Sequence, residues 1–317
     1  MPAPSRRRPR APGRRPSDHV RQRAPPQADR RPSAGLHPAD RPSRRGPVPP
    51  HRTRGLSGER TRRQPPHHSP SAWTAAAVPR PHAEVRLYCL PFLGGPASFF
   101  LPLVPELPDW VEPYPVELPG HGRRLREPAV RDVLELAGRL ADEVGREAAG
   151  RPFAFFGHCG GGLLAFEATR HLRRRGLAQP VLLGVSATPP PHGWHSLVAA
   201  LRTRPLHSLM PLFRELAARQ ALHASSANAV LKREVSVYLR YRYREEAPLD
   251  APISVFGGRD DSVVPQDAAR TWSELSRGRV RHRVYPGRHF YIDDRWPEVA
   301  WSLARDLRGV LEADSLA

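Results

Sequence analysis

Hydrophobic and polar positions follow two alternating periods after residue 82. Short apolar runs have the length of buried strands; they lie at residues 85–90, 112–117, 153–156, 180–185, 253–256 and 280–285. Between them, apolar residues recur at helical spacing, as at Val133, Leu136, Leu140 and Val144. Strands that alternate with helices predict an α/β domain with a mostly parallel sheet, right-handed crossovers and helices on both faces.

Three further segments have an apolar pattern of their own. The run from Phe99 to Leu107 predicts the start of a helix, and the last helix is predicted to open at Pro297. Residues 192–247 interrupt the alternation, and Val235, Tyr238, Leu239 and Tyr241 to Tyr243 predict a helix within them. An insertion at this place predicts a helical lid over an active site. Ordinary helix packing is the alternative for most of its apolar residues.

Residues 1–80 differ in composition from the rest of the chain. They hold 19 Arg and 4 acidic residues, so they carry +15 of the formal net charge of +19. A segment of Arg, Pro, Ser and His cannot bury enough apolar surface to offset its ordering entropy. We therefore predict a disordered tail over 1–80, or translated upstream sequence with the true start near Val78, and a folded domain over 81–317. An Arg-rich tail could bind nucleic acid, but the segment has no aromatic interleaving, so a nucleic-acid partner is not expected.

The chain has two cysteines, Cys89 and Cys159, in different predicted strand contexts. A disulfide framework is therefore not expected, and a reducing cytoplasm fits. No apolar run approaches the ~18 residues needed to span a bilayer, and the Arg-rich start lacks the apolar core of a secretory signal. The expectation is a cytoplasmic protein without a membrane partner.

The candidate chemistry centres on residues 151–175, which read as strand, sharp turn and helix. The turn contains Gly157, Cys159 and Gly161 in the G-x-C-x-G pattern of a nucleophile elbow, with sulfur where serine oxygen is usual. The flanking glycines allow a strained backbone and a close approach of strand to helix. A small buried core cysteine is the alternative interpretation of Cys159.

Two later strand ends supply the partners that a nucleophile needs. Asp260 and Asp261 follow one predicted strand, and His289 follows the next. α/β-hydrolase triads have the nucleophile first along the chain, then the acid and then the histidine. Taken one at a time, the aspartates could instead cap a helix, and His289 could be an incidental histidine. The Gly94-Gly95 loop after the first strand could point backbone N–H groups at an oxyanion. We expect no cofactor and no metal ion.

The chain resembles the type II, stand-alone thioesterases of polyketide and nonribosomal peptide pathways over residues 83–312. The matching segments are PFLGGPASFF beside the family's PHAGGSASxF, LPGHGRRLREP beside YPGRGxRxxEP, and GHCGGGLLAFE beside GHSMGAxxAFE, with further matches at YRYREEAPLDAPISVFGGRDDSVV and YPGRHFYI. The resemblance implies an α/β-hydrolase fold with a lid over about residues 192–247. It also implies a partner, namely an acyl or peptidyl carrier protein that bears an acyl-phosphopantetheine.

The resemblance also implies a role for each matching residue. Cys159 would be the nucleophile, His289 the base and then the acid, and Asp261 the residue that orients His289. The backbone N–H groups of Leu93 and Gly160 would form the oxyanion hole. Three positions depart from the family pattern: Cys159 replaces serine, Gly160 replaces methionine, and Leu93 replaces a small residue.

Three functions follow as alternatives. The first is a thioesterase that releases acyl groups through an acyl-cysteine intermediate. The second is an acyltransferase that passes the acyl group to an amine or alcohol, for which the missing side chain of Gly160 would leave room. The third is an inactive module that binds a carrier protein.

Overall fold

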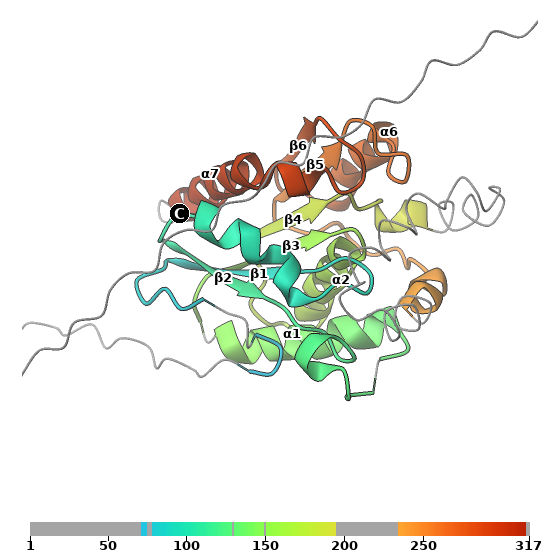
Figure 1. The fold of residues 1–317 in the computed structure, drawn as a ribbon, viewed down its shortest axis with the longest axis horizontal. Coiled ribbons are helices and arrows are strands. Elements are labelled where there is room, and N and C mark those ends of the chain that lie inside the picture. Colours follow the sequence, from blue (N-terminus) through green and yellow to red (C-terminus); the bar gives the residue numbers. More distant parts are fainter. Residues whose placement is uncertain (1–70, 75–77, 129, 149, 195–233, 315–317) are drawn as a thin grey trace, which may run out of the picture. The chain divides into compact units, whose positions relative to one another are not determined.

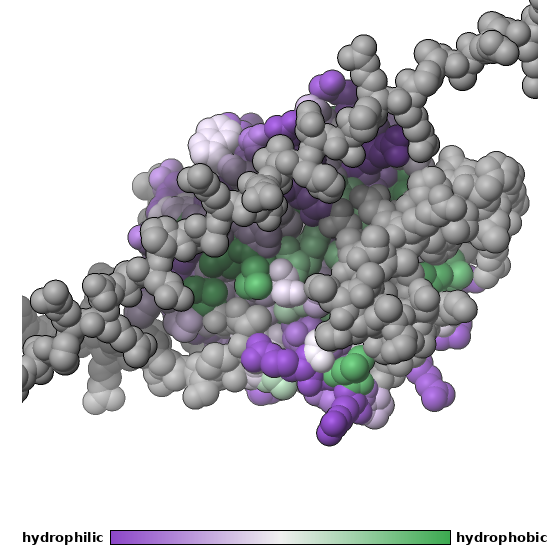
Figure 2. Space-filling view, viewed as in Figure 1, coloured by the Kyte–Doolittle hydropathy of each residue, from purple (hydrophilic) through white to green (hydrophobic). Residues whose placement is uncertain are grey.

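The computed structural model describes residues 71–74, 78–128, 130–148, 150–194 and 234–314. Residues 1–70 of the predicted tail and residues 195–233 of the predicted lid lie outside these ranges. On the face seen in Figure 2, hydrophobic residues gather toward the middle of the described part, and hydrophilic residues lie along its margins.

Six parallel strands form one sheet in the order β2-β1-β3-β4-β5-β6, which confirms the predicted α/β class (Figure 1). The strands are β1 (Val85–Leu90), β2 (Val111–Pro115), β3 (Phe153–His158), β4 (Leu182–Ser186), β5 (Ile253–Gly258) and β6 (Val280–Tyr285). The strand order reverses between β1 and β3, because β2 lies outward of β1 on one side and β4 outward of β3 on the other. Open α/β sheets bind ligands at such a switch point, beyond the carboxyl ends of the strands.

Helices cover both faces of the sheet (Figure 1). On one face, α1 (Val133–Ala148) and α2 (Gly160–Arg174) pack together and bury a core with Leu140, Leu164 and Phe155. On the other, α7 (Trp296–Asp314) packs with η1 (Ala97–Glu106) around Phe100 and Leu303. The short helix α6 (Gln266–Arg270) follows β5. Each face has its own apolar core, as a sheet buried on both sides requires.

Two helix predictions need correction. The segment from Phe99 to Leu107 forms the 3-10 helix η1 instead of an α-helix; it contains Pro102 and Pro105, whose rings exclude the i to i−4 hydrogen bonds. The predicted helix at Val235 ends earlier than expected, because residues 234–239 are helical but Tyr241 to Tyr243 are not.

The folded part begins before the predicted boundary at residue 81. Trp73 is 8% exposed and belongs to the α1 and α2 core, where the Arg124 guanidinium lies 4.3 Å from its ring centroid. The hydroxyl of Thr74 donates a 2.5 Å hydrogen bond to Glu147. The Arg80 guanidinium donates to the carbonyl groups of four residues, namely Val104, Leu107, Pro108 and Val111. Residues 71–80 therefore include chain that packs on the domain.

Candidate active site

Cys159 lies between β3 and α2 with φ 54° and ψ −120°, a conformation that non-glycine residues rarely adopt. A Cβ at Gly157 would stand 2.3 Å from the Gly161 carbonyl carbon, and one at Gly161 would stand 2.2 Å from the Leu90 oxygen. Both glycines are therefore required by the close approach of strand, turn and helix. The result is a thiol held at the N-terminus of α2, over the carboxyl end of β3.

His289 and Asp261 follow β6 and β5 and face each other. His289 Nδ1 lies 2.9 Å from Asp261 Oδ2, and both side chains are almost completely buried. The second carboxylate oxygen, Oδ1, accepts hydrogen bonds from the backbone N–H groups of Val263 and Val264. Asp260 is exposed, so the structure places Asp261 and not its neighbour against the imidazole. The carboxylate fixes the orientation of the ring and requires the proton on Nδ1.

The imidazole of His289 also interacts with the Cys159 thiol. Burial alone would lower the pKa of His289, but the charges of Cys159 and Asp261 and the hydrogen bond to Asp261 raise it, to about 10. The imidazole therefore carries a proton at neutral pH and can stabilise a thiolate beside it. The structure thus brings together the three predicted triad residues.

The thiol belongs to a cluster of apolar side chains. Phe92 and Phe290 are buried with Cys159, and Leu93, Phe99 and Val235 pack around them. Cys89, by contrast, lies within β1 with no exposed surface, and burial raises the pKa of its thiol far above the ordinary value. Of the two thiols, only Cys159 adjoins a base.

The two predicted oxyanion residues are neighbours. A Cβ at Gly160 would stand 2.9 Å from Leu93 Cγ and 3.0 Å from Tyr238 Cε1. The space at Gly160 is therefore filled, which corrects the expectation that it leaves room for a second substrate. Leu93 follows β1 and Gly160 follows β3, so the strand switch point brings them together.

Sequence patterns did not indicate a second polar cluster, which lies beside the Leu93 loop. The backbone N–H of Gly94 donates to Glu234 Oε2, and Glu234 Oε1 lies 2.9 Å from His121 Nε2. The backbone N–H of Ala97 donates a 3.3 Å hydrogen bond to Glu117 Oε1. Two buried carboxylates thus bind the two ends of the loop that contains Gly94 and Gly95.

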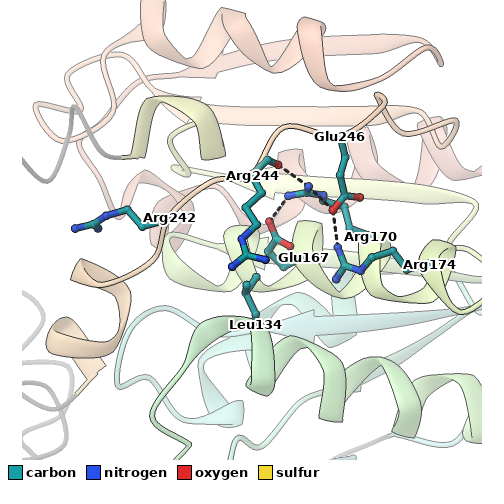
Figure 3. Close-up of a pocket in the computed structure, with 7 residues that line it drawn as sticks. All are labelled: Leu134, Glu167, Arg170, Arg174, Arg242, Arg244 and Glu246. Atoms are coloured by element: carbon teal, nitrogen blue, oxygen red, sulfur yellow. Dashed lines mark hydrogen bonds and ion pairs between the residues drawn. The ribbon is translucent and has the colours of Figure 1, made fainter.

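A cavity of about 230 Å³ at the C-terminal half of α2 has a different character (Figure 3). Its lining is mostly charged: Leu134, Glu167, Arg170, Arg174, Arg242, Arg244 and Glu246. Arg170 lies 2.7 Å from Glu167 and 2.6 Å from Glu246, and Arg174 lies 2.8 Å from Glu246. The two pairs with Glu246 attach the segment before β5 to α2. No thiol or histidine lines this cavity, so we do not assign the chemistry to it.

The part of the chain that the structure describes contains no group of three or more His, Cys, Asp or Glu residues suited to hold a metal ion. Among the same residues, no helix is both long and apolar enough to cross a membrane.

Known proteins are similar to this chain in both sequence and fold. The family model described as Thioesterase domain matches residues 85–307. Gramicidin S biosynthesis protein GrsT from Aneurinibacillus migulanus is 29% identical over 245 residues, which cover 75% of this chain and 95% of GrsT. Thioesterase PikA5 from Streptomyces venezuelae is 31% identical over 240 residues, which cover 72% of this chain and 82% of PikA5.

A solved thioesterase structure is also similar to this chain. RedJ, a thioesterase from the prodiginine biosynthetic pathway in Streptomyces coelicolor, superposes with a TM-score of 0.60 at 30% identity. The match covers 70% of this chain and 87% of RedJ.

Proposed function

Because the chain belongs to the thioesterase family, we propose that it hydrolyses acyl thioesters held on the phosphopantetheine arm of polyketide or nonribosomal peptide carrier proteins. The names of GrsT and RedJ, which mention gramicidin S biosynthesis and the prodiginine biosynthetic pathway, support a role in biosynthesis, and the name of PikA5 supports thioesterase activity. GrsT is matched over 95% of its length, which supports a stand-alone, type II enzyme.

The proposed reaction proceeds through an acyl-cysteine on Cys159. The thiolate attacks the thioester carbonyl, and the oxyanion that forms is bound by the backbone N–H groups of Leu93 and Gly160. His289 gives its proton to the departing phosphopantetheine thiol. In the second step His289 removes a proton from water, the hydroxide attacks the acyl-cysteine, and the free acid leaves as the Cys159 thiolate is restored.

The observation that carries this proposal is the position of the buried His289 imidazole, which lies 2.9 Å from Asp261 and beside the Cys159 thiol. A module that only binds a carrier protein has no need of a buried imidazole between a thiol and a carboxylate. The apolar side chains around Cys159 fit an acyl chain.

The test is to mix the full chain with an acyl-carrier-protein thioester. Intact mass spectrometry should show a transient acyl adduct on the chain, and free acid should accumulate in excess of the enzyme. If neither adduct nor acid forms with any acyl length, the chain is not a thioesterase of this kind.

A further inference from the structure

Three segments far apart in the sequence meet at the buried carboxylate of Glu234. This residue belongs to the 234–239 helix and is 9% exposed. One of its oxygens accepts the backbone N–H of Gly94, in the loop after β1. The other lies 2.9 Å from Nε2 of His121, in the turn after β2, and His121 is 4% exposed. Glu234 therefore joins the 234–239 helix to the loop that contains Leu93.

The same helix contacts Leu93 and Gly160 through a second residue. Tyr238 lies four residues after Glu234, so both residues lie on one side of the helix. Tyr238 fills the space at Gly160 together with Leu93, and its carbonyl accepts a 2.9 Å hydrogen bond from Trp194 Nε1. A shift of this helix would therefore displace both proposed oxyanion donors.

The surroundings of His121 favour its charged form. Nδ1 lies 3.2 Å from the Pro119 carbonyl, which can only accept, so Nδ1 carries a proton; the carboxylate 2.9 Å from Nε2 favours a second proton there. Among the residues that the structure describes, the charged groups that face the imidazole are Glu234 and Glu117. Burial by itself lowers the pKa of His121, but the charge of Glu234 raises it, and the net pKa lies above its ordinary value.

We propose that Glu234 is a positioning residue for the acylation of Cys159, and that the positive charge of His121 keeps it in place. This inference rests on the proposed function. Glu234 fixes the peptide unit next to the proposed oxyanion donor Leu93 and does not touch the reacting atoms. Oxyanion donors act on charge that develops in the transition state, so the effect falls on the acylation rate and little on KM.

Residue 121 makes this arrangement sensitive to pH. Histidine at residue 121 can lose its charge, whereas the charge of an arginine there would be fixed. Below the raised pKa of His121 the pair with Glu234 is an ion pair. As the pH rises through that pKa, the imidazole becomes neutral and the carboxylate loses its counter-charge. Acylation should therefore decline on the alkaline side, earlier than in a variant with a permanent charge at residue 121.

The experiment compares four full-length proteins: wild type, Glu234→Gln, His121→Arg and the control His171→Arg. The control changes another histidine–carboxylate pair, in which His171 Nε2 lies 3.3 Å from Asp142 Oδ1, between α2 and α1. Single-turnover acylation by an acyl-carrier thioester is measured from pH 6 to 10 by quenching and intact mass. His289 titrates in all four proteins, so differences between their profiles report residues 121 and 234.

We expect Glu234→Gln to lower the maximal acylation rate by about 10-fold and to change KM by less than about 2-fold. This loss of rate is smaller than the ~10²-fold or more that follows removal of an oxyanion donor. His121→Arg should retain the rate at pH 7 and extend it to higher pH, while His171→Arg should follow wild type. Normal rates in Glu234→Gln, together with coincident profiles of His121→Arg and wild type, would overturn this inference alone. Absence of an acyl-enzyme in wild type would overturn the proposed function and this inference with it.

Discussion

The side chain of Leu93 fills the space that a side chain at Gly160 would occupy. Its Cγ stands 2.9 Å from an ideal Cβ at residue 160, closer than real Cβ contacts come. The thioesterase pattern that this chain resembles implies a small residue in place of Leu93 and methionine in place of Gly160. Relative to that pattern, a large and a small residue are exchanged between the loop after β1 and the first residue of α2. The two departures are therefore one change in packing, in which the volume beside the nucleophile is kept.

Restoring the family's methionine alone should damage the site. Gly160→Met should clash with Leu93 and Tyr238, displace the loop after β1 and lower the acylation rate by at least about 10-fold, given that ~10² is lost with one oxyanion donor. The double variant Leu93→Ala with Gly160→Met should recover most of that rate. The measurement is a double-mutant cycle on single-turnover acylation. Additive effects of the two substitutions would show that these residues do not share one space.

Removal of the thiol should abolish the acyl-enzyme. Cys159→Ala should give no acyl adduct in intact mass spectra and retain the thermal unfolding midpoint of wild type, because a small residue remains at the elbow. Cys89→Ala is the matched control, because Cys89 is completely buried in β1. It should still be acylated. An adduct that persists in Cys159→Ala would place the nucleophile elsewhere.

Loss of the imidazole should slow alkylation of the thiol. In wild type, His289 is protonated below its pKa of about 10, so iodoacetamide should label Cys159 rapidly at pH 6.5. An ordinary thiol with a pKa near ~8.5 is only about 1% thiolate at that pH, so His289→Gln should be labelled up to about 10²-fold more slowly. Raising the pH to 9 should restore most of the rate in His289→Gln. Equal rates at pH 6.5 would mean that the imidazole does not activate the thiol.

Sulfur at residue 159 should change how the acyl-enzyme is consumed. Attack on a carrier thioester exchanges one thioester for another, so the acyl-cysteine keeps a carbonyl that reacts well with amines. Cys159→Ser should retain measurable hydrolysis but lose most amide formation when an amine is supplied. Free acid and amide are quantified over a graded series of amine concentrations. If wild type yields only free acid throughout, acyl transfer to amines is excluded as an activity of this site.

The N-terminal contact of Trp73 should contribute measurably to stability. Replacing a buried tryptophan with alanine costs about 3 kcal/mol, and a domain of this size loses about 2–4 °C per kcal/mol. Trp73→Ala should therefore lower the unfolding midpoint by about 6–12 °C in a thermal scan. A chain that starts at residue 71 should keep the wild-type midpoint, and one that starts at residue 78 should match Trp73→Ala. Equal midpoints for both truncated chains would remove Trp73 from the core.

The sequence predicted those features that depend on residues near one another. Buried runs identified all six strands, and the elbow pattern with its glycines located Cys159. The type of helix at 97–106 was missed although Pro102 and Pro105 were visible, because the apolar spacing was given more weight than the missing N–H groups. Trp73 was missed because it is the single aromatic residue in the first 80, within a composition typical of disorder.

The pair of Glu234 and His121 could not have been found in this way. The two residues are separated by more than a hundred positions, and neither belongs to a periodic pattern. Their contact arises because the loops after β1 and β2 lie at the same edge of the sheet and the 234–239 helix returns to them. Single-sequence patterns carry no signal for such long-range polar contacts, whereas the triad was recognisable because its order along the chain is a known motif.

Because the proposed base His289 follows β6, the proposed activity depends on the margin of the sheet. In the sheet as described, β6 pairs with β5 alone. The residues of β6 are half-buried or exposed, whereas those of β3 are buried. Fraying of this margin would withdraw the base from Cys159 while both cores stayed intact. During synthesis, likewise, the ribosome adds more than a hundred residues after Cys159 before it adds His289. Cys159 and His289 can therefore meet only after β6 has paired with β5.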